Sequence, residues 1–481
     1  MNASYPFYSH GKAKAESLAN HSAARAFLVG FSAHDKATLT RNINAHANVA
    51  DRFYLADLAH TFNTKRTRFP HRAFTIAREG QEAETFALSS FKFGSAGKKK
   101  PRLGFIFTGQ GAQWAEMGAE AMKDFPYFRE TIRDLEVVLK LCPNLPSWSL
   151  EEELLAPPET SRVSNAEIAQ PALTAVQIAI VDMFASWNIA PSVSVGHSSG
   201  EKGAAYAAGH ISAPEAMLAA YYRGYALAQY APTGGTMLAV GMGAAEATQK
   251  IPSLGEDPVV ACENSPNSAT LSGINVAIAM IKALLDANGI FTRELQTGQA
   301  YHSSHMDVVA RPFVEVLTKS YDALSPARLS WRRLAGRMVS SVIADEISED
   351  AINPQYWALK LTNPVRFDEA VAKLGKIPGL DEVRLMIEIG PHAALTGPFK
   401  QICKANGFDH FAYTPSLIRG ADDTVSLLKT AGESFIQDYP IDIQQVNAAE
   451  QVAEAGTKTK ALRPDTLVDF PPYQWNYERT N

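Results

Sequence analysis

Residues 192–209 read SVSVGHSSGEKGAAYAAG, and the character of the chain changes abruptly within this stretch. Val193 and Val195 alternate with serines, as in a short buried strand. Glycines then flank a His-Ser-Ser tripeptide centred on Ser198, and a run of small residues typical of a helix follows. The pattern predicts a strand, a turn too tight for Cβ atoms on either side, and a helix.

The turn around Ser198 has the form of a nucleophile elbow, which exposes a reactive serine hydroxyl between a strand and a helix. Such a turn places the unpaired N–H groups of the helix N-terminus directly beneath the hydroxyl. A tight turn that merely prefers small residues is the alternative, because pentapeptides of this kind also occur by chance. The strand–turn–helix context favours the nucleophile.

A serine nucleophile needs a base, because its hydroxyl is hardly ionised at neutral pH. The candidate base is His302 in GQAYHSSHM, and His305 in the same segment competes with it for this role. A buried structural histidine is the alternative for either residue. The chain offers no clearly marked Asp or Glu to orient the imidazole, so a backbone carbonyl is a candidate acceptor.

Two N–H donors are also needed to stabilise an oxyanion in acyl chemistry. The elbow supplies the N–H of Ser199, and the Gly-rich turn FTGQGAQW offers a second donor at Gln110. An ordinary β–α turn with positive φ at glycine explains the same motif.

Arg223 lies 25 residues after Ser198 in an apolar helical run. Most such arginines extend to solvent, whereas one that points inward would bind a carboxylate through two parallel hydrogen bonds.

The bulk composition excludes several classes of protein. A net charge of −5 gives no electrostatic reason to expect nucleic acid as a partner. Three widely separated cysteines argue against a disulfide framework and favour a reducing compartment. The N-terminal residues lack the apolar core of a secretory signal, and the most apolar stretch, 171–184, is interrupted by Gln177 and Asp182. We expect a cytoplasmic protein with no membrane span.

The length of 481 residues predicts two or three folding units, and the hydrophobic patterns divide the chain accordingly. Residues 1–90 form a small α/β unit whose first helix is expected to be capped by Ser32. Residues 103–437 form an α/β-hydrolase-like unit with a parallel sheet covered on both faces. A ferredoxin-like insert is expected at about 237–300, with two helices on a small antiparallel sheet. Residues 438–481 are a linker and an aromatic, proline-rich tail.

Seven motifs in this order resemble the acyltransferase domain of type I polyketide and fatty-acid synthases over about 103–400: GQGAQW, QPAL, GHSSGE, Arg223, AYHSSHM, NPVRF and EIGPHAAL. The N-terminal unit resembles the linker between ketosynthase and acyltransferase. YTPSLIRG and the DFPPYQW tail resemble the post-acyltransferase linker. The GHSSGE and YHSSHM variants are most similar to iterative fungal, highly-reducing-like synthases. The resemblance implies a piece of a megasynthase whose ketosynthase, carrier and reductive domains lie outside this chain.

The resemblance implies a ping-pong transfer without a bound cofactor or metal. Ser198, activated by His302, would attack malonyl-CoA, and the phosphopantetheine thiol of an acyl carrier protein would then take the malonyl group. A main-chain carbonyl near Asn363–Arg366 would orient His302. The remaining roles carried over are oxyanion donors at Gln110 and Ser199, a carboxylate site at Arg223, and further substrate contacts at Gln170, His197, Asn264 and Tyr301.

Tyr301, the residue before the candidate base, bears on which acyl group the site accepts. Methylmalonyl-selective relatives carry a small residue there, so the bulky ring is expected to crowd a 2-methyl group, which is worth about 1–3 kcal/mol. The chain has Gln299 and Tyr301 where His and Phe are usual in the malonyl pattern. Malonyl is therefore the expected extender.

Two other functions remain open from the sequence. A serine hydrolase would use the same elbow and histidine, but it needs no buried arginine and usually has an acid between the two in the chain. A non-catalytic docking fragment is the second alternative, and it fits residues 1–90 and 465–476 better than the central unit.

Overall fold

The structure is a computed structural model that describes residues 25–78, 80–97, 101–251, 257–295, 297–324, 334–380, 382–448 and 464–476. The N-terminal segment without an apolar core and most of the linker after residue 447 lie outside these ranges. Packing divides the chain into two compact units. The smaller unit comprises the described parts of Met1–Lys100, Ser186–Asn188 and Thr424–Asn481. The larger unit comprises those of Pro101–Ala185 and Ile189–Asp423.

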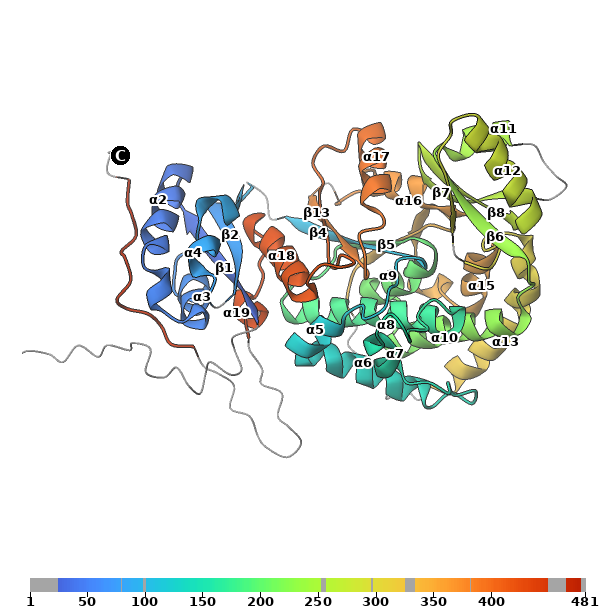
Figure 1. Ribbon diagram of the computed structural model, residues 1–481, viewed down its shortest axis with the longest axis horizontal. Coiled ribbons are helices and arrows are strands. Elements are labelled where there is room, and N and C mark those ends of the chain that lie inside the picture. Colours follow the sequence, from blue (N-terminus) through green and yellow to red (C-terminus); the bar gives the residue numbers. More distant parts are fainter. Residues whose placement is uncertain are drawn as a thin grey trace, which may run out of the picture. The chain divides into compact units, whose positions relative to one another are not determined.

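The smaller unit is an antiparallel sheet of order β1-β2-β3 with helices packed on it (Figure 1). The strands are β1 (Ala26–Ala33), β2 (His71–Arg78) and β3 (Lys92–Ser95). The helices near its start are α2 (Lys36–Ala47) and α3 (Leu55–Thr64).

The expected cap at Ser32 is wrong, because Ser32 is still paired in β1 and Asp35 caps α2 instead. The Asp35 side chain accepts a hydrogen bond from the N–H of Thr38 at 2.8 Å.

Helix α18 (Asp423–Ile436) packs with the smaller unit from Thr424 onward, although the sequence grouped it with the larger one. A Cβ atom at Gly432 would lie 2.3 Å from the ring of Phe74, so the helix approaches β2 very closely. Glu433 pairs with Lys92. The helix therefore belongs to the packing of the smaller unit, and the domain limits 1–90, 103–437 and 438–481 remain predictions.

The described part of the C-terminal tail packs against the core of the smaller unit. Leu467, Phe470 and Tyr473 contact its buried apolar cluster. Phe470 stacks on His46 with ring centroids 5.1 Å apart. The backbone is held as well, since the N–H of Leu467 donates to Thr61 Oγ1 at 3.0 Å. The tail thus covers apolar surface of the N-terminal sheet and its helices.

Truncation of the chain before Val468 is expected to expose that surface while leaving the larger unit folded. It removes two of the three tail side chains that pack on the cluster, Phe470 and Tyr473. We expect stronger binding of a hydrophobic dye and a lower melting temperature, with little change in the reactivity of Ser198 toward a fluorophosphonate. Loss of that reactivity in a folded truncation would contradict this placement of the tail.

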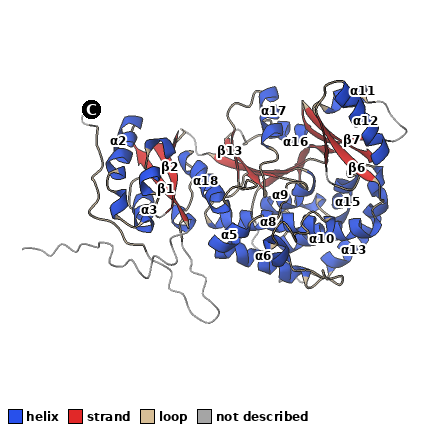
Figure 2. Cartoon of the chain, in the orientation of Figure 1, coloured by secondary structure: helices blue, strands red, loops and turns tan. Residues whose placement is uncertain are grey.

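The larger unit contains a six-stranded sheet of order β11-β10-β5-β4-β13-β14 (Figures 1 and 2). All neighbours are parallel except β10 and β11. The strands are β4 (Arg102–Phe107), β5 (Val193–Gly196), β10 (Arg337–Ser340), β11 (Asp345–Ile347), β13 (Val383–Ile389) and β14 (Ala412–Pro415). Five consecutive residues of β4 are buried, which requires cover on both faces, so the predicted covered parallel sheet is confirmed.

Helices of the larger unit flank this sheet. They include α5 (Ala119–Asp124), α6 (Pro126–Leu139), α7 (Leu150–Leu155), α8 (Ala166–Ser186), α9 (Glu201–Ala208), α10 (Ala213–Tyr230), α13 (Asp307–Asp322), α15 (Pro354–Thr362), α16 (Phe367–Leu374) and α17 (Thr396–Asn406). Two of them, α8 and α10, carry the candidate residues Gln170 and Arg223. Among the described residues, only α8 is long and apolar enough to cross a membrane, and 89% of its most apolar window is buried in the fold. Gln177 interrupts the apolar run of this helix, and its side-chain amide donates to Thr108 O at 2.8 Å. It is the buried helix expected from the sequence.

The insert has the order of elements and the strand order of a ferredoxin-like fold, as predicted. Its strands pair antiparallel in the order β7-β8-β6-β9. In chain order the elements are β6 (Gly235–Val240), α11 (Ala244–Lys250), β7 (Val259–Ser265), β8 (Ser268–Ile274), α12 (Asn275–Ala287) and β9 (Thr292–Leu295). A short strand from the NPVRF motif, β12 (Val365–Arg366), adds to the edge at β7. This pairing, which the sequence did not indicate, joins the insert to the segment after α15.

Candidate active site

The turn after β5 holds Ser198 in a left-handed backbone conformation with φ of 50°. Such a conformation is strained for a residue with a Cβ atom, and it occurs often at functional turns. The flanking glycines have a steric reason. A Cβ at Gly196 would lie 2.4 Å from the backbone N of Glu201, and one at Gly200 would lie 2.5 Å from the carbonyl O of Phe107. The chain can therefore pass from β5 into α9 only without side chains at these two positions.

Replacement of Gly200 by alanine is expected to distort the turn, because the added methyl group meets backbone atoms that cannot rotate away. We expect a loss of about 1–3 kcal/mol of stability and a slower reaction of Ser198 with a fluorophosphonate. Gly397→Ala is the matched control, since a Cβ there meets no atom within 4 Å. Equal behaviour of the two variants in thermal melts and labelling would contradict the steric argument.

His302 lies next to the candidate nucleophile, with Ser198 Oγ and His302 Nε2 2.7 Å apart. Its Nδ1 lies 3.0 Å from the carbonyl O of Asn363. Because a carbonyl only accepts, Nδ1 carries the proton and Nε2 is free to accept from the serine. Burial, with Arg223 and Lys360 as nearby cations, holds the pKa of His302 well below its usual value. The imidazole is therefore neutral, as a base must be.

The competing histidine is placed elsewhere by the fold. His305 Nε2 lies 3.0 Å from Oδ2 of Asp257, a residue of the insert just before β7. The acceptor for His302 is a backbone carbonyl within the range expected from the sequence. Of the two candidates, the structure thus brings His302 to Ser198.

The Gly-rich loop after β4 packs directly against the turn. A Cβ at Gly109 would lie 2.7 Å from the carbonyl O of His197 and 3.1 Å from Ser198 Cβ. The Gln110 N–H donates to Ser199 Oγ at 2.9 Å, and the Gln110 side chain accepts from Gln170 Nε2 at 2.6 Å. Three of the expected residues thus meet beside Ser198, and the two candidate oxyanion donors belong to adjoining segments.

Arg223 of α10 is a buried cation, with 2% of its surface exposed. Its Nε has no hydrogen-bond partner among the described residues, and no carboxylate pairs with it there. The guanidinium carbon lies 5.6 Å from the centre of the Tyr301 ring. Burial lowers the Arg223 pKa to about 10, so the group is still charged at neutral pH. A buried charge of this kind is costly unless an anion joins it.

The insert reaches the turn through Asn264 of β7. His197 Nε2 donates to Asn264 Oδ1 at 2.8 Å, and the Asn264 amide in turn donates to Thr270 Oγ1 at 3.0 Å. Burial lowers the pKa of His197 to about 4, so this ring is neutral as well. Asn264 therefore orients the residue that precedes Ser198.

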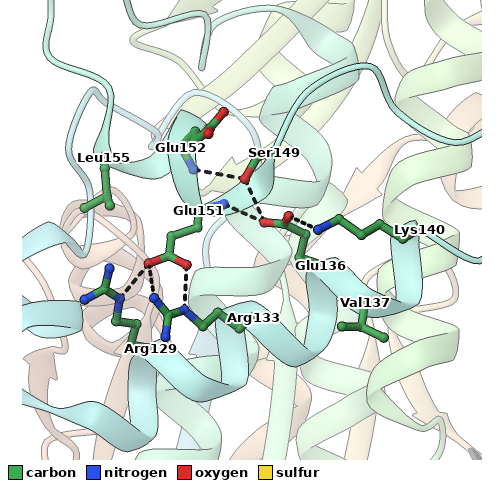
Figure 3. Close-up of a pocket in the computed structure, with 9 residues that line it drawn as sticks. All are labelled: Arg129, Arg133, Glu136, Val137, Lys140, Ser149, Glu151, Glu152 and Leu155. Atoms are coloured by element: carbon green, nitrogen blue, oxygen red, sulfur yellow. Dashed lines mark hydrogen bonds and ion pairs between the residues drawn. The ribbon is translucent and has the colours of Figure 1, made fainter. Parts of the chain in front are cut away.

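A separate surface cavity of about 510 Å³ lies at α6 and α7 of the larger unit (Figure 3). Most of its charged side chains pair with one another. Arg129 Nε and Arg133 Nε donate to the two oxygens of Glu151 at 2.6 and 2.7 Å. None of the candidate residues named above lines this cavity. Its chemistry is that of a paired surface network.

Sequence comparison identifies the family of the larger unit. A family model described as an acyl transferase domain matches residues 104–438. The chain is 42% identical to the reducing polyketide synthase DEP5 of Fusarium langsethiae, over 94% of this chain and 19% of that protein. It is 41% identical to the highly reducing polyketide synthase resH of Aspergillus sclerotiorum, over 94% of this chain and 18% of that protein. The chain thus spans about a fifth of the length of these relatives.

Solved structures agree with this result. The acyltransferase domain from module 8 of the salinomycin polyketide synthase superposes with a TM-score of 0.75 at 24% identity, covering 87% of this chain and 98% of that one. A loading acyltransferase from the avermectin modular polyketide synthase has a TM-score of 0.60 at 26% identity, covering 69% of this chain and 99% of that one. The chain belongs to the acyl transferase domain family, with reducing polyketide synthases of fungi as its relatives.

Proposed function

We propose that this acyltransferase domain loads malonyl groups from malonyl-CoA onto Ser198 and passes them to the phosphopantetheine thiol of an acyl carrier protein. One observation carries the proposal. A serine–histidine pair has an O–N distance of 2.7 Å, and the ring of Tyr301, the residue before His302, lies against Arg223. Arg223 is a buried cation that lacks a carboxylate partner among the described residues. A malonyl group has the two ends that such a site needs, a thioester carbonyl and a free carboxylate.

In the first half-reaction, Ser198 Oγ attacks the thioester carbonyl while His302 Nε2 takes the hydroxyl proton. The tetrahedral oxyanion accepts hydrogen bonds from the N–H groups of Ser199 and Gln110. To do so, the backbone N–H of Gln110 gives up its hydrogen bond to Ser199 Oγ and donates to the oxyanion instead. When the intermediate collapses, the C–S bond breaks and His302 returns the proton to the CoA sulfur. The carrier thiol then attacks the serine ester in the same manner, and Ser198 regains its proton.

Arg223 would bind the free carboxylate through two parallel hydrogen bonds, which also restores charge balance to a buried cation. Tyr301 lies against Arg223 and is 3% exposed, so its ring leaves little room for a methyl group on C2. Gln170, bonded to Gln110, would hold the oxyanion loop, while His197 and Asn264 would form the wall on the side of the insert. Malonyl is accordingly the proposed extender, ahead of methylmalonyl.

The proposed partners of this domain are the acyl carrier protein and the other domains of the same synthase. The relatives are several times longer than this chain, which supports a ketosynthase and other domains in the same synthase. The smaller unit would join this domain to them. We propose a cytoplasmic location and no role for nucleic acid, a membrane or a resident cofactor.

The test is the mass of the intact protein after exposure to a mixture of malonyl-, methylmalonyl- and acetyl-CoA. We expect a malonyl adduct on Ser198 that disappears when holo carrier protein is added, with malonyl transferred to the carrier. Rapid release of free malonate with and without carrier would identify a hydrolase instead. Absence of any adduct would favour a docking fragment without catalytic activity.

A further inference from the structure

Two fully buried residues of opposite charge lie behind the candidate site. Glu201 is 0% exposed and Lys360 is 2% exposed, and Lys360 Nζ lies 3.5 Å from Glu201 Oε1. Glu201 is the first residue of α9, three positions after Ser198. Lys360 lies near the end of α15. The pair therefore links the helix that begins at the nucleophile to a helix from a distant part of the sequence.

Both carboxylate oxygens of Glu201 accept hydrogen bonds. The backbone N–H of Ser341 donates to Oε1, and the hydroxyl of Tyr356 donates to Oε2 at 2.6 Å. Lys360 Nζ donates to Ser341 Oγ at 2.6 Å, and this hydroxyl also lies 2.8 Å from the carbonyl O of Gly196. The network thus holds both ends of the turn, at Gly196 before Ser198 and at Glu201 after it.

The other side of the network holds the histidine. The residue after Lys360 is Leu361, whose carbonyl O accepts from the backbone N–H of His302 at 3.1 Å. Two residues further on, the carbonyl O of Asn363 accepts from His302 Nδ1 at 3.0 Å. Both bonds that fix His302 therefore originate within three residues of the buried lysine.

Stability does not account for an ion pair at this depth. The cost of removing both charges from water roughly cancels their attraction, and apolar residues of similar volume stabilise a core as well or better. Directional bonds at both ends do provide a fixed geometry. A shift of about 1 Å between reacting groups costs on the order of 100-fold in rate.

We propose that Glu201 and Lys360 are positioning residues that set the distance between Ser198 and His302. The inference rests on the proposed function only in taking Ser198 as the nucleophile and His302 as its base. The ion pair fixes α9 against the end of α15, so the serine and the imidazole meet at hydrogen-bond distance before any substrate arrives.

The charge of Lys360 also bears on the pH dependence of the site. Burial lowers the pKa of His302 most, followed by the charge of Arg223 on α10, that of Lys360 on α15 and the nearby His197. The hydrogen bond to the Asn363 carbonyl raises it. Removal of the Lys360 cation, with Glu201 left behind, therefore raises the pKa of His302. Because the base must be neutral, the low-pH limb of the reaction moves to higher pH.

The experiment measures the rate at which a fluorophosphonate labels Ser198, since this reaction needs the serine and its base but not Arg223, CoA or a carrier. We expect Lys360→Met and Glu201→Gln to slow labelling on the order of 10- to 100-fold. Lys360→Met is also expected to shift the low-pH midpoint of the rate upward. The matched control is Lys373→Met, which removes a half-buried lysine paired with Asp345, and we expect a wild-type rate and midpoint.

Thermal melts separate positioning from folding. The double variant Glu201→Gln, Lys360→Met buries no uncompensated charge, so we expect a melting temperature near that of the wild type and a rate that is still low. A folded double variant with the wild-type rate and midpoint would overturn the inference. If the single variants do not fold, Tyr356→Phe decides, because it removes one bond to Glu201 while keeping the ring. A decrease of about 3-fold or more supports the inference and an unchanged rate overturns it.

The same probe distinguishes this inference from the proposed function. Wild-type protein that labels rapidly with the fluorophosphonate yet takes no malonyl from malonyl-CoA would contradict the proposed function alone. Variants that label like the wild type would contradict the positioning role alone.

Discussion

The Ser198→Ala variant is expected to form no acyl-enzyme with malonyl-CoA. Ser198 Oγ is the atom that lies 2.7 Å from the acceptor nitrogen of His302, and alanine has nothing there to acylate. Removal of a serine nucleophile costs on the order of 10⁶ in rate in a well-studied serine enzyme. The turn itself should persist, because its tight packing depends on Gly196 and Gly200 rather than on the hydroxyl.

The measurement is the intact mass of the protein after incubation with malonyl-CoA, together with a thermal melt. Ser320→Ala is a matched control in α13, where the buried hydroxyl donates to the carbonyl O of Val316 at 2.9 Å. We expect this control to acquire the same adduct as the wild type. A persistent adduct on Ser198→Ala would move the nucleophile to another residue.

The parts of the fold that the sequence predicted are those with local signals. The strand, turn and helix around Ser198 follow from alternating valines, paired glycines and a small-residue run. The insert follows because strand and helix periods alternate within a single segment. For the candidate site, no acid was marked beside His302, and the structure supplies the carbonyl of Asn363 as its acceptor.

Features that depend on contacts between distant parts of the chain could not be predicted from the sequence. Helix α18 carries an ordinary amphipathic pattern, and only its contacts in three dimensions, such as those of Gly432 with Phe74 and Glu433 with Lys92, show that it packs with the smaller unit. Strand β12 has two residues, too few for a recognisable period. Ser32 satisfies the preference for a helix cap, but pairing of β1 with β2 keeps it extended and moves the cap to Asp35.

Buried charges were the least predictable feature of the site. Glu201, Lys202 and Lys360 lie in short helical segments where charged residues usually face solvent, and all three are at most 2% exposed. Lys202 Nζ lies 3.4 Å from the carbonyl O of Ser199. Burial, followed by the nearby Arg223 and Lys360, lowers the pKa of Lys202 well below its usual value. Only the packed structure reveals that these three ionisable side chains are buried near the nucleophile.

The Arg223→Ala variant is expected to lose most of its preference for malonyl over acetyl groups. A carboxylate that enters this buried site finds its countercharge in Arg223, and the loss of a hydrogen bond to a charged group costs about 1.5–3 kcal/mol. That corresponds to a decrease of roughly 10- to 150-fold in kcat/KM for malonyl-CoA. Acetyl-CoA has no free carboxylate, so its reaction at Ser198 should change far less.

The comparison is a competition between malonyl-CoA and acetyl-CoA, read from the masses of the two acyl-enzymes. Arg311→Ala provides the matched control, because the side chain of this arginine on α13 is 89% exposed and pairs with its helical neighbour Glu315. Arg223→Lys refines the argument, since a lysine keeps the charge but cannot offer two parallel hydrogen bonds. An intermediate preference for that variant would separate the effect of charge from that of geometry. An unchanged ratio in Arg223→Ala would remove Arg223 from the acyl site.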